Sequence, residues 1–99
     1  MSIDDVEDRV RDLAPSLGQL GAVIKFCLKD GGILSVNATC EHVEVSREDC
    51  PADTTVTISS GDLMKLMDGK LDPMVAFAMG KIKVDGSKGL AMKLTKLLG

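Results

Sequence analysis

The chain has 99 residues, of which 44% are hydrophobic and 27% are charged, and its formal net charge is −3 at pH 7. This length supports one domain, because two separate cores would each be too small for a stable fold. The composition is that of a globular protein rather than a disordered or fibrous one. The negative charge and the absence of Trp and Tyr argue against nucleic-acid binding, which depends on basic surfaces and base stacking.

The charge is unevenly distributed along the chain. Residues 81–99 hold five lysines and one aspartate, whereas residues 1–80 hold seven basic and 14 acidic side chains. An acidic body therefore carries a basic C-terminal segment. The N-terminal sequence has neither a basic nor an apolar export region, and the three cysteines lack CxxC spacing. Because such cysteines are typical of reduced thiols, we expect a cytoplasmic protein.

A first helix is predicted over residues 2–14. Ser2 is a suitable N-cap, and Pro15 is expected to end or kink the helix because proline lacks a backbone N–H. The amphipathic pattern fits either a lid over the core or a helix that binds a partner protein. The apolar residues at helical spacing are Ile3, Val6, Val10, Leu13 and Leu17.

Alternating apolar residues predict strands over residues 21–29 and 34–38. The Asp-Gly-Gly sequence at 30–32 is a strong turn signal, so these two strands should form a hairpin. Shorter alternating stretches indicate a third strand over 43–45 and a fourth over 54–59.

Cap residues predict three further helices, over residues 62–68, 73–79 and 88–98, with a fifth strand over 81–85. Each helix follows a Ser or Asp N-cap, and the second also has proline at its first position. Strands that alternate bury one face, so the helices should gather on that face. The expected fold class is α+β, with a five-stranded, mostly antiparallel sheet and helices packed on one face.

Three short motifs follow one another in the second half of the chain. They are DTTVTI at residues 53–58, GKLDP at 69–73 and AMGKIKV at 78–84. Together with the order of the elements, they resemble the sterol carrier protein-2 (SCP-2) lipid-binding family. The resemblance is specific over residues 53–98, looser over the first strands and weakest in the N-terminal helix.

The resemblance implies a single SCP-2-like domain over residues 1–99, with a matched core at 21–98. It further implies an apolar tunnel between sheet and helices for acyl chains, fatty acyl-CoA or sterols, and no catalytic residues. The chain is shorter than many relatives, so a smaller pocket is expected. Its last residues, Leu97-Leu98-Gly99, are not a peroxisomal signal, so we expect a bacterial-type stand-alone domain instead.

Five of the six methionines lie between residues 52 and 98. Methionine is flexible and polarizable, and it adapts to apolar partners of varied shape. Composition alone favours ordinary core filling, whereas the family resemblance favours a lipid site. The predicted lipid-binding residues are Phe26, Val36, Ile58, Leu63, Met64, Met67, Met74, Phe77, Met79, Ile82, Leu90, Leu94 and Leu97.

The last predicted helix carries a second possible contact surface. Lys88, Met92 and Lys96 lie together on its polar side, away from the leucines. A methionine within a lysine stripe could contact a lipid headgroup or, transiently, an anionic membrane, although a lysine stripe is more often only a solvated face.

Cys40, His42 and Glu44 alternate along the predicted third strand and would project from one face. Such a group could hold a metal or support a Cys–His nucleophile. The chain has one histidine and no nucleophile-elbow motif, which favours ordinary polar residues. We therefore expect no metal, no cofactor and no catalytic residue.

The sequence as a whole favours a non-enzymatic protein that binds a lipid and transfers it within the cell. Candidate ligands are a fatty acid, a fatty acyl-CoA, a sterol or an isoprenoid-like chain. The alternative is a scaffold or accessory module for lipid-handling enzymes, which would hold no lipid and would contact its protein partner through the N-terminal helix.

Overall fold

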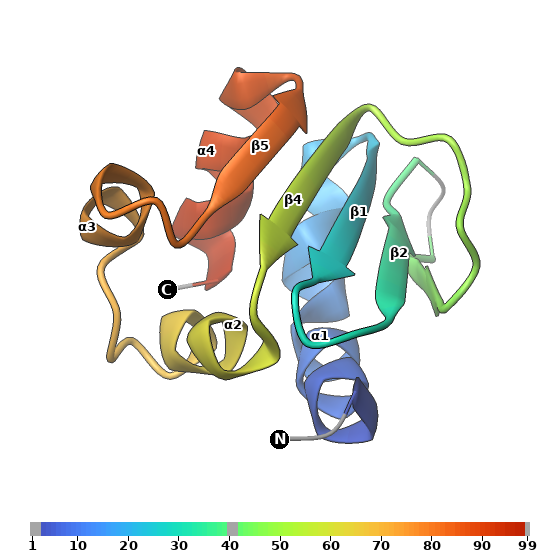
Figure 1. The fold of residues 1–99 in the computed structure, drawn as a ribbon. Coiled ribbons are helices and arrows are strands. Elements are labelled where there is room, and N and C mark those ends of the chain that lie inside the picture. The colour runs from blue at the N-terminus through green and yellow to red at the C-terminus, as the bar shows by residue number, and fades with distance from the viewer. Residues whose placement is uncertain (1–2, 40–41, 99) are drawn as a thin grey trace.

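A computed structural model describes residues 3–39 and 42–98 of the chain. The elements alternate between one sheet and the helices that cover it (Figure 1). In chain order they are α1 (Ile3–Leu17), the short 3-10 helix η1 (Gly18–Leu20), β1 (Val23–Leu28), β2 (Ile33–Asn37), β3 (Glu44–Ser46), β4 (Thr54–Ile58), α2 (Ser60–Met67), α3 (Pro73–Ala78), β5 (Lys83–Gly86) and α4 (Lys88–Leu98). None of the helices in these ranges is long and apolar enough to cross a bilayer.

The five strands form one mixed sheet in the order β3-β2-β1-β4-β5. Neighbours are antiparallel except for β1 and β4, which run parallel at the centre. The sheet is therefore five-stranded and mostly antiparallel, as the sequence predicts, and β1 and β2 form the expected hairpin. In this register Phe26 lies opposite both Leu34 and Val56.

One face of the sheet carries the core. Figure 1 views the sheet from the other face, with α1 and α4 behind the strands and α2 below β4. Helix α1 contacts α2, α4 and β3, and α4 contacts β4 and β5. The prediction that helices gather on the apolar face is confirmed. The buried residues of that face are Ile24, Phe26, Leu28, Leu34, Val36, Val45, Thr54, Val56 and Ile58.

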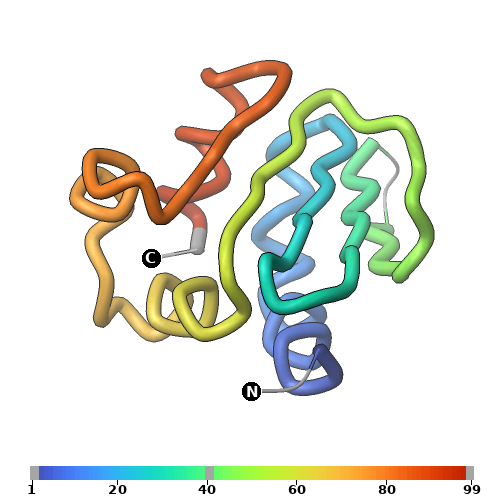
Figure 2. Tube along the Cα trace, viewed as in Figure 1, coloured from blue at the N-terminus to red at the C-terminus, as the bar shows by residue number. Residues whose placement is uncertain are grey.

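The opposite face of the sheet is partly covered by the segment 47–53, which curves back from β3 to β4 (Figure 2). The Nζ of Lys25 lies 2.7 Å from Oδ1 of Asp49, and the Ser35 hydroxyl donates to the carbonyl of Glu48 at 2.5 Å. The hydrogen bond with Asp49 raises the pKa of Lys25 above its ordinary value. This segment therefore explains why Ser35 is buried although it faces away from the helices.

Helix α1 differs from its predicted form. It continues through Pro15 to Leu17, whereas the sequence places its end near residue 14. The buried apolar face includes Val6, Val10 and Leu17, so tertiary packing outweighs the hydrogen bond that proline cannot donate. The predicted N-cap, Ser2, lies outside the described residues.

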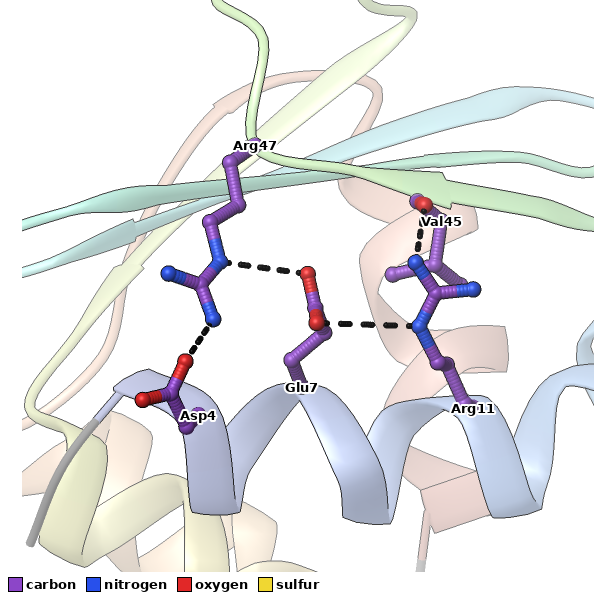
Figure 3. Close-up of polar contacts among 5 residues, drawn as sticks. All are labelled: Asp4, Glu7, Arg11, Val45 and Arg47. Atoms are coloured by element: carbon purple, nitrogen blue, oxygen red, sulfur yellow. Dashed lines mark hydrogen bonds and ion pairs between the residues drawn. The ribbon is translucent and has the colours of Figure 1, made fainter.

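Ion pairs attach α1 to the segment around β3 (Figure 3). Arg47 binds the carboxylates of Asp4 and Glu7, the second with Nε 3.2 Å from Oε1. Arg11 donates to the carbonyl of Val45 at 2.9 Å, and its Nε lies 3.7 Å from Oε2 of Glu7. The carboxylates of Asp4 and Glu7 raise the pKa of Arg47 above its ordinary value. Helix α1 is thus fixed by its apolar face and by charges along one side.

Candidate functional site

An apolar cavity of about 290 Å³ lies between α3, β5 and α4, with β4 at its base. Its wall includes two residues with polar side-chain atoms, Lys88 and Thr95. The lining residues are Val56, Pro73, Met74, Phe77, Ile82, Val84, Lys88, Ala91, Met92 and Thr95.

Local capping chemistry places α3 as one wall. The Asp72 carboxylate accepts a hydrogen bond from the N–H of Met74 at 2.8 Å, and Pro73 occupies the first turn. At the other end the N–H of Lys81 donates to the carbonyl of Ala76 at 2.9 Å, and Gly80 adopts a positive φ of 76°. The chain therefore reverses after α3 and returns along the cavity.

The other two walls follow without a spacer. Ile82 and Val84 lie two residues apart, so both side chains point to the helix side of β5. Ser87 then begins α4, since its hydroxyl accepts a hydrogen bond from the N–H of Leu90 at 3.3 Å. Ala91 and Thr95 lie four residues apart on the face of α4 that looks toward α3.

The base and the rim of the cavity differ in burial. Val56 and Ile82 are buried, whereas Met74 is 67% exposed and Phe77 is 54% exposed. Met92 on α4 is exposed as well. The cavity thus has a fixed base and a rim that includes side chains with many rotamers.

Three of the predicted lipid-binding residues line this cavity, namely Met74, Phe77 and Ile82. Of the residues predicted to contact a headgroup or membrane, Lys88 and Met92 also line it. Lys96 is exposed one turn further along α4. The structure therefore brings together side chains that the sequence assigned to two separate roles.

The remaining predicted lipid-binding residues do not line the cavity. Met79 is exposed beside it, and Met64, Leu90 and Leu97 are half-buried against the core. The others belong to the buried core: Phe26, Val36, Ile58, Leu63, Met67 and Leu94. These core side chains lie between the sheet and helices α1, α2 and α4, so the cavity beside α3 lies to one side of the position predicted for a tunnel. The tunnel itself stays a prediction.

Sequence reasoning missed five lining residues, listed here in chain order: Val56, Pro73, Val84, Ala91 and Thr95. Two patterns in the sequence indicate three of these five residues. Period-two alternation from Ile82 leads to Val84, and helical spacing from Lys88 leads to Ala91 and Thr95. No local pattern indicates that α3 stands opposite these positions.

The predicted grouping of Cys40, His42 and Glu44 on one strand is not observed. Strand β3 begins at Glu44, and His42 lies in an exposed bend before it. Cys40 lies outside the described residues. Within residues 3–39 and 42–98, no three His, Cys, Asp or Glu side chains come together as they would around a metal ion.

The sequence and the fold are similar to those of sterol carrier proteins. Sterol carrier protein 2 of Bos taurus is 34% identical over 101 residues, which cover 94% of this chain. The solution structure of a sterol carrier protein domain of Helicoverpa armigera is 33% identical, with a TM-score of 0.74, and the match covers 96% of this chain and 80% of that one.

A palmitate complex of sterol carrier protein-2 from Aedes aegypti shares the fold, with a TM-score of 0.75 at 21% identity, and the match covers 100% of this chain and 97% of that one. The bovine relative is longer, and the match covers only 18% of it. The family model described as the SCP-2 sterol transfer family matches residues 3–99. The chain therefore belongs to the SCP-2 sterol transfer family.

Proposed function

We propose that this chain binds the hydrocarbon tail of a lipid in the cavity between α3, β5 and α4. The proposal rests on the apolar wall of this cavity. Among the lining residues, only Lys88 and Thr95 have polar side-chain atoms. The Aedes aegypti protein of the same fold was solved with palmitate, which supports an acyl chain as the ligand class.

The size of the cavity bears on affinity. A volume of about 290 Å³ lies just below the usual range of ligand pockets, which is roughly 300–1,000 Å³. Burying about ten methylenes at ~0.8 kcal/mol each contributes roughly 8 kcal/mol. Ordering the ligand costs several kcal/mol of this, so binding is micromolar or weaker. Exchangeable binding of this kind suits a protein that transfers lipid within the cytoplasm.

We propose that this binding is not coupled to catalysis. The Thr95 hydroxyl already donates to the carbonyl of Met92 in its own helix, at 2.8 Å. Lys88 lies at the exposed start of α4, where its ammonium group suits contact with a lipid carboxylate or phosphate. The polar groups of the wall are thus suited to holding a ligand rather than to transforming one.

The alternative function, a scaffold that meets its partner through α1, has less support. The apolar face of α1 packs inside the domain, and the side chains it presents outward include Asp8 and Asp12. A protein partner would therefore have to recognise an acidic surface.

The direct test is palmitate titration of the delipidated protein, followed by thermal unfolding and by NMR. We expect the unfolding temperature to rise, because a ligand present at 100 times its Kd stabilises the folded state by about 2.7 kcal/mol. The amide signals of Phe77, Ile82 and Met92 should shift most. Unchanged unfolding and unchanged signals at these residues would contradict the proposal.

A further inference from the structure

Helix α3 is apolar on all sides yet lies at the surface. Its sequence is PMVAFA, and Ala76 is its one buried residue. Met74 is 67% exposed, Phe77 54%, and the C-cap residue Met79 64%. A helix without a polar face is normally buried in a core or in lipid. The exposure of α3 therefore indicates that another surface binds there.

The exposed apolar residues of the domain gather at this one place. Within the described residues, the large hydrophobic side chains that are exposed all belong to α3, its C-cap and the adjacent face of α4. We refer to them as the apolar rim, which consists of Met74, Val75, Phe77, Met79 and Met92. Single exposed apolar residues are common, whereas a contiguous group marks an interaction surface.

Four lysines lie on α4 or in the turn after α3, beside the apolar rim, and one exposed carboxylate, Asp72, lies at the start of α3. Lys88 and Lys96 lie four residues on either side of Met92, so the three side chains follow one line along α4. Lys81 is half-exposed and lies three residues after the end of α3, and Lys93 is exposed on α4. Among the described residues none of these four lysines forms an ion pair. Their charge is therefore available to an anionic partner.

Helix α1 does not offer a second surface for such a partner. The apolar residues of α1 are buried, and its exposed side chains include Asp4, Asp8 and Asp12. An anionic surface would repel this acidic helix and attract the lysines near the apolar rim. The uneven charge of the chain would orient the domain with α3 toward that surface.

We propose that the apolar rim and its lysines dock the domain onto an anionic membrane. Apolar side chains would enter the boundary between headgroups and acyl chains while the lysines contact lipid phosphates. A second copy of this chain fits less well, because a two-fold pairing through the apolar rim would bring lysines together. Since Met74, Phe77 and Met92 also line the cavity, docking would direct its opening toward the bilayer.

The test is co-sedimentation of ligand-free protein with vesicles, which does not depend on the proposed lipid tail in the cavity. We expect binding to vesicles of equal parts phosphatidylglycerol and phosphatidylcholine, and little binding to phosphatidylcholine alone. Binding should fall in about 1 M salt, where the screening length is about 3 Å. Equal binding to both vesicle types, or binding to neither, would overturn the proposal.

Two variants separate the charge from the apolar contact. K88Q/K96Q should weaken vesicle binding about 25-fold. Each lysine near an anionic surface contributes about 1 kcal/mol, which is about fivefold in the binding constant, and two lysines are removed. K29Q is the matched control, because Lys29 is exposed at the distant β1–β2 turn, and it should bind within about twofold of the parent protein. Equal losses for both variants would overturn the assignment to α4.

V75S/M79S tests the apolar contact alone, because neither residue lines the cavity. We expect weaker vesicle binding while palmitate still raises the unfolding temperature as in the parent chain. Vesicle binding equal to the parent would overturn the role of α3. If sedimentation of the parent protein shows dimers that V75S/M79S abolishes, the occupant is a second copy and the membrane proposal is wrong. Loss of palmitate binding alone would count against the proposed function and not against docking.

Discussion

The carboxylate of Asp30 accepts two hydrogen bonds from Ser60, one from the backbone N–H at 2.9 Å and one from the hydroxyl. Asp30 lies in the β1–β2 turn, and Ser60 is the first residue of α2. The turn thereby supplies a negative charge to the positive end of a helix that is remote in sequence. Ser59 provides the local cap, with its hydroxyl accepting from the N–H of Asp62 at 3.2 Å.

This contact predicts a specific dependence of stability on pH. Hydrogen bonds from the Ser60 hydroxyl and backbone N–H lower the pKa of Asp30 below its ordinary value. A lowered pKa stabilises the folded state above the pKa of the unfolded chain, and this stabilisation is lost as pH falls through the lowered folded-state value. D30N should therefore unfold at a lower temperature near neutral pH, and the difference from the parent should disappear in acid.

Circular dichroism melts across the acidic pH range would measure this difference. S60A is the matched variant, because it removes the hydroxyl donor and keeps the backbone N–H. It should show the same trend with a smaller amplitude. A D30N difference that persists unchanged in strong acid would show that the carboxylate charge is not the cause.

Gly86 and Gly89 should respond to alanine in opposite directions. Gly86 has a φ of 93°, and a Cβ there would lie 2.5 Å from the carbonyl oxygen of Asp53. G86A should cost about 2 kcal/mol or more in urea unfolding, because both backbone strain and overlap with fixed backbone oppose it. G89A should add up to about 1 kcal/mol, because Gly89 is helical with open space around it. Equal effects at both positions would contradict this account.

Filling the cavity should block the ligand without unfolding the domain. T95F places a ring in the cavity, and we expect palmitate affinity to fall at least about tenfold, a change of about 1.4 kcal/mol. The control is T57F, which adds the same ring on the face of β4 that points away from the helices. Isothermal titration calorimetry with palmitate would measure the affinity of both variants, and T57F should bind as the parent protein does. Unchanged binding by T95F would place the ligand elsewhere.

Removing the Arg47 guanidinium should loosen the attachment of α1. R47Q loses both contacts with Asp4 and Glu7, so its unfolding temperature should fall by a few degrees at most, since exposed ion pairs contribute little. High salt should shrink the difference because it screens exposed charges. K65Q, which alters an exposed lysine without an ion pair among the described residues, serves as the control. A difference that grows with salt would exclude an electrostatic origin.

Features set by neighbouring residues could be predicted from the sequence. The bounds of α4, the Asp72 cap and the β1–β2 hairpin were all predictable, because each depends on contacts within a few residues. Pro15 shows the reverse case. Its local signal ends a helix, whereas the burial of Leu17 extends it.

The candidate site was only partly predictable for a related reason. Period-two and helical spacing show which side chains share a face, yet they do not show which element packs over that face. Met67 and Met79 illustrate this, because both follow leucine-rich or apolar helical patterns while one is buried and the other is exposed. The difference arises because α2 packs against α1 and α4, whereas α3 lies to one side of the other helices (Figure 1).

The outermost strands of the sheet are short. Strand β3 has three residues and β5 has four, and β5 begins with the exposed Lys83. Long flat edges with free backbone groups recruit strands from other molecules and lead to aggregation, and short or charged edges suppress this. The domain can therefore expose the apolar helix α3 without also exposing a strand edge on which fibrils could grow.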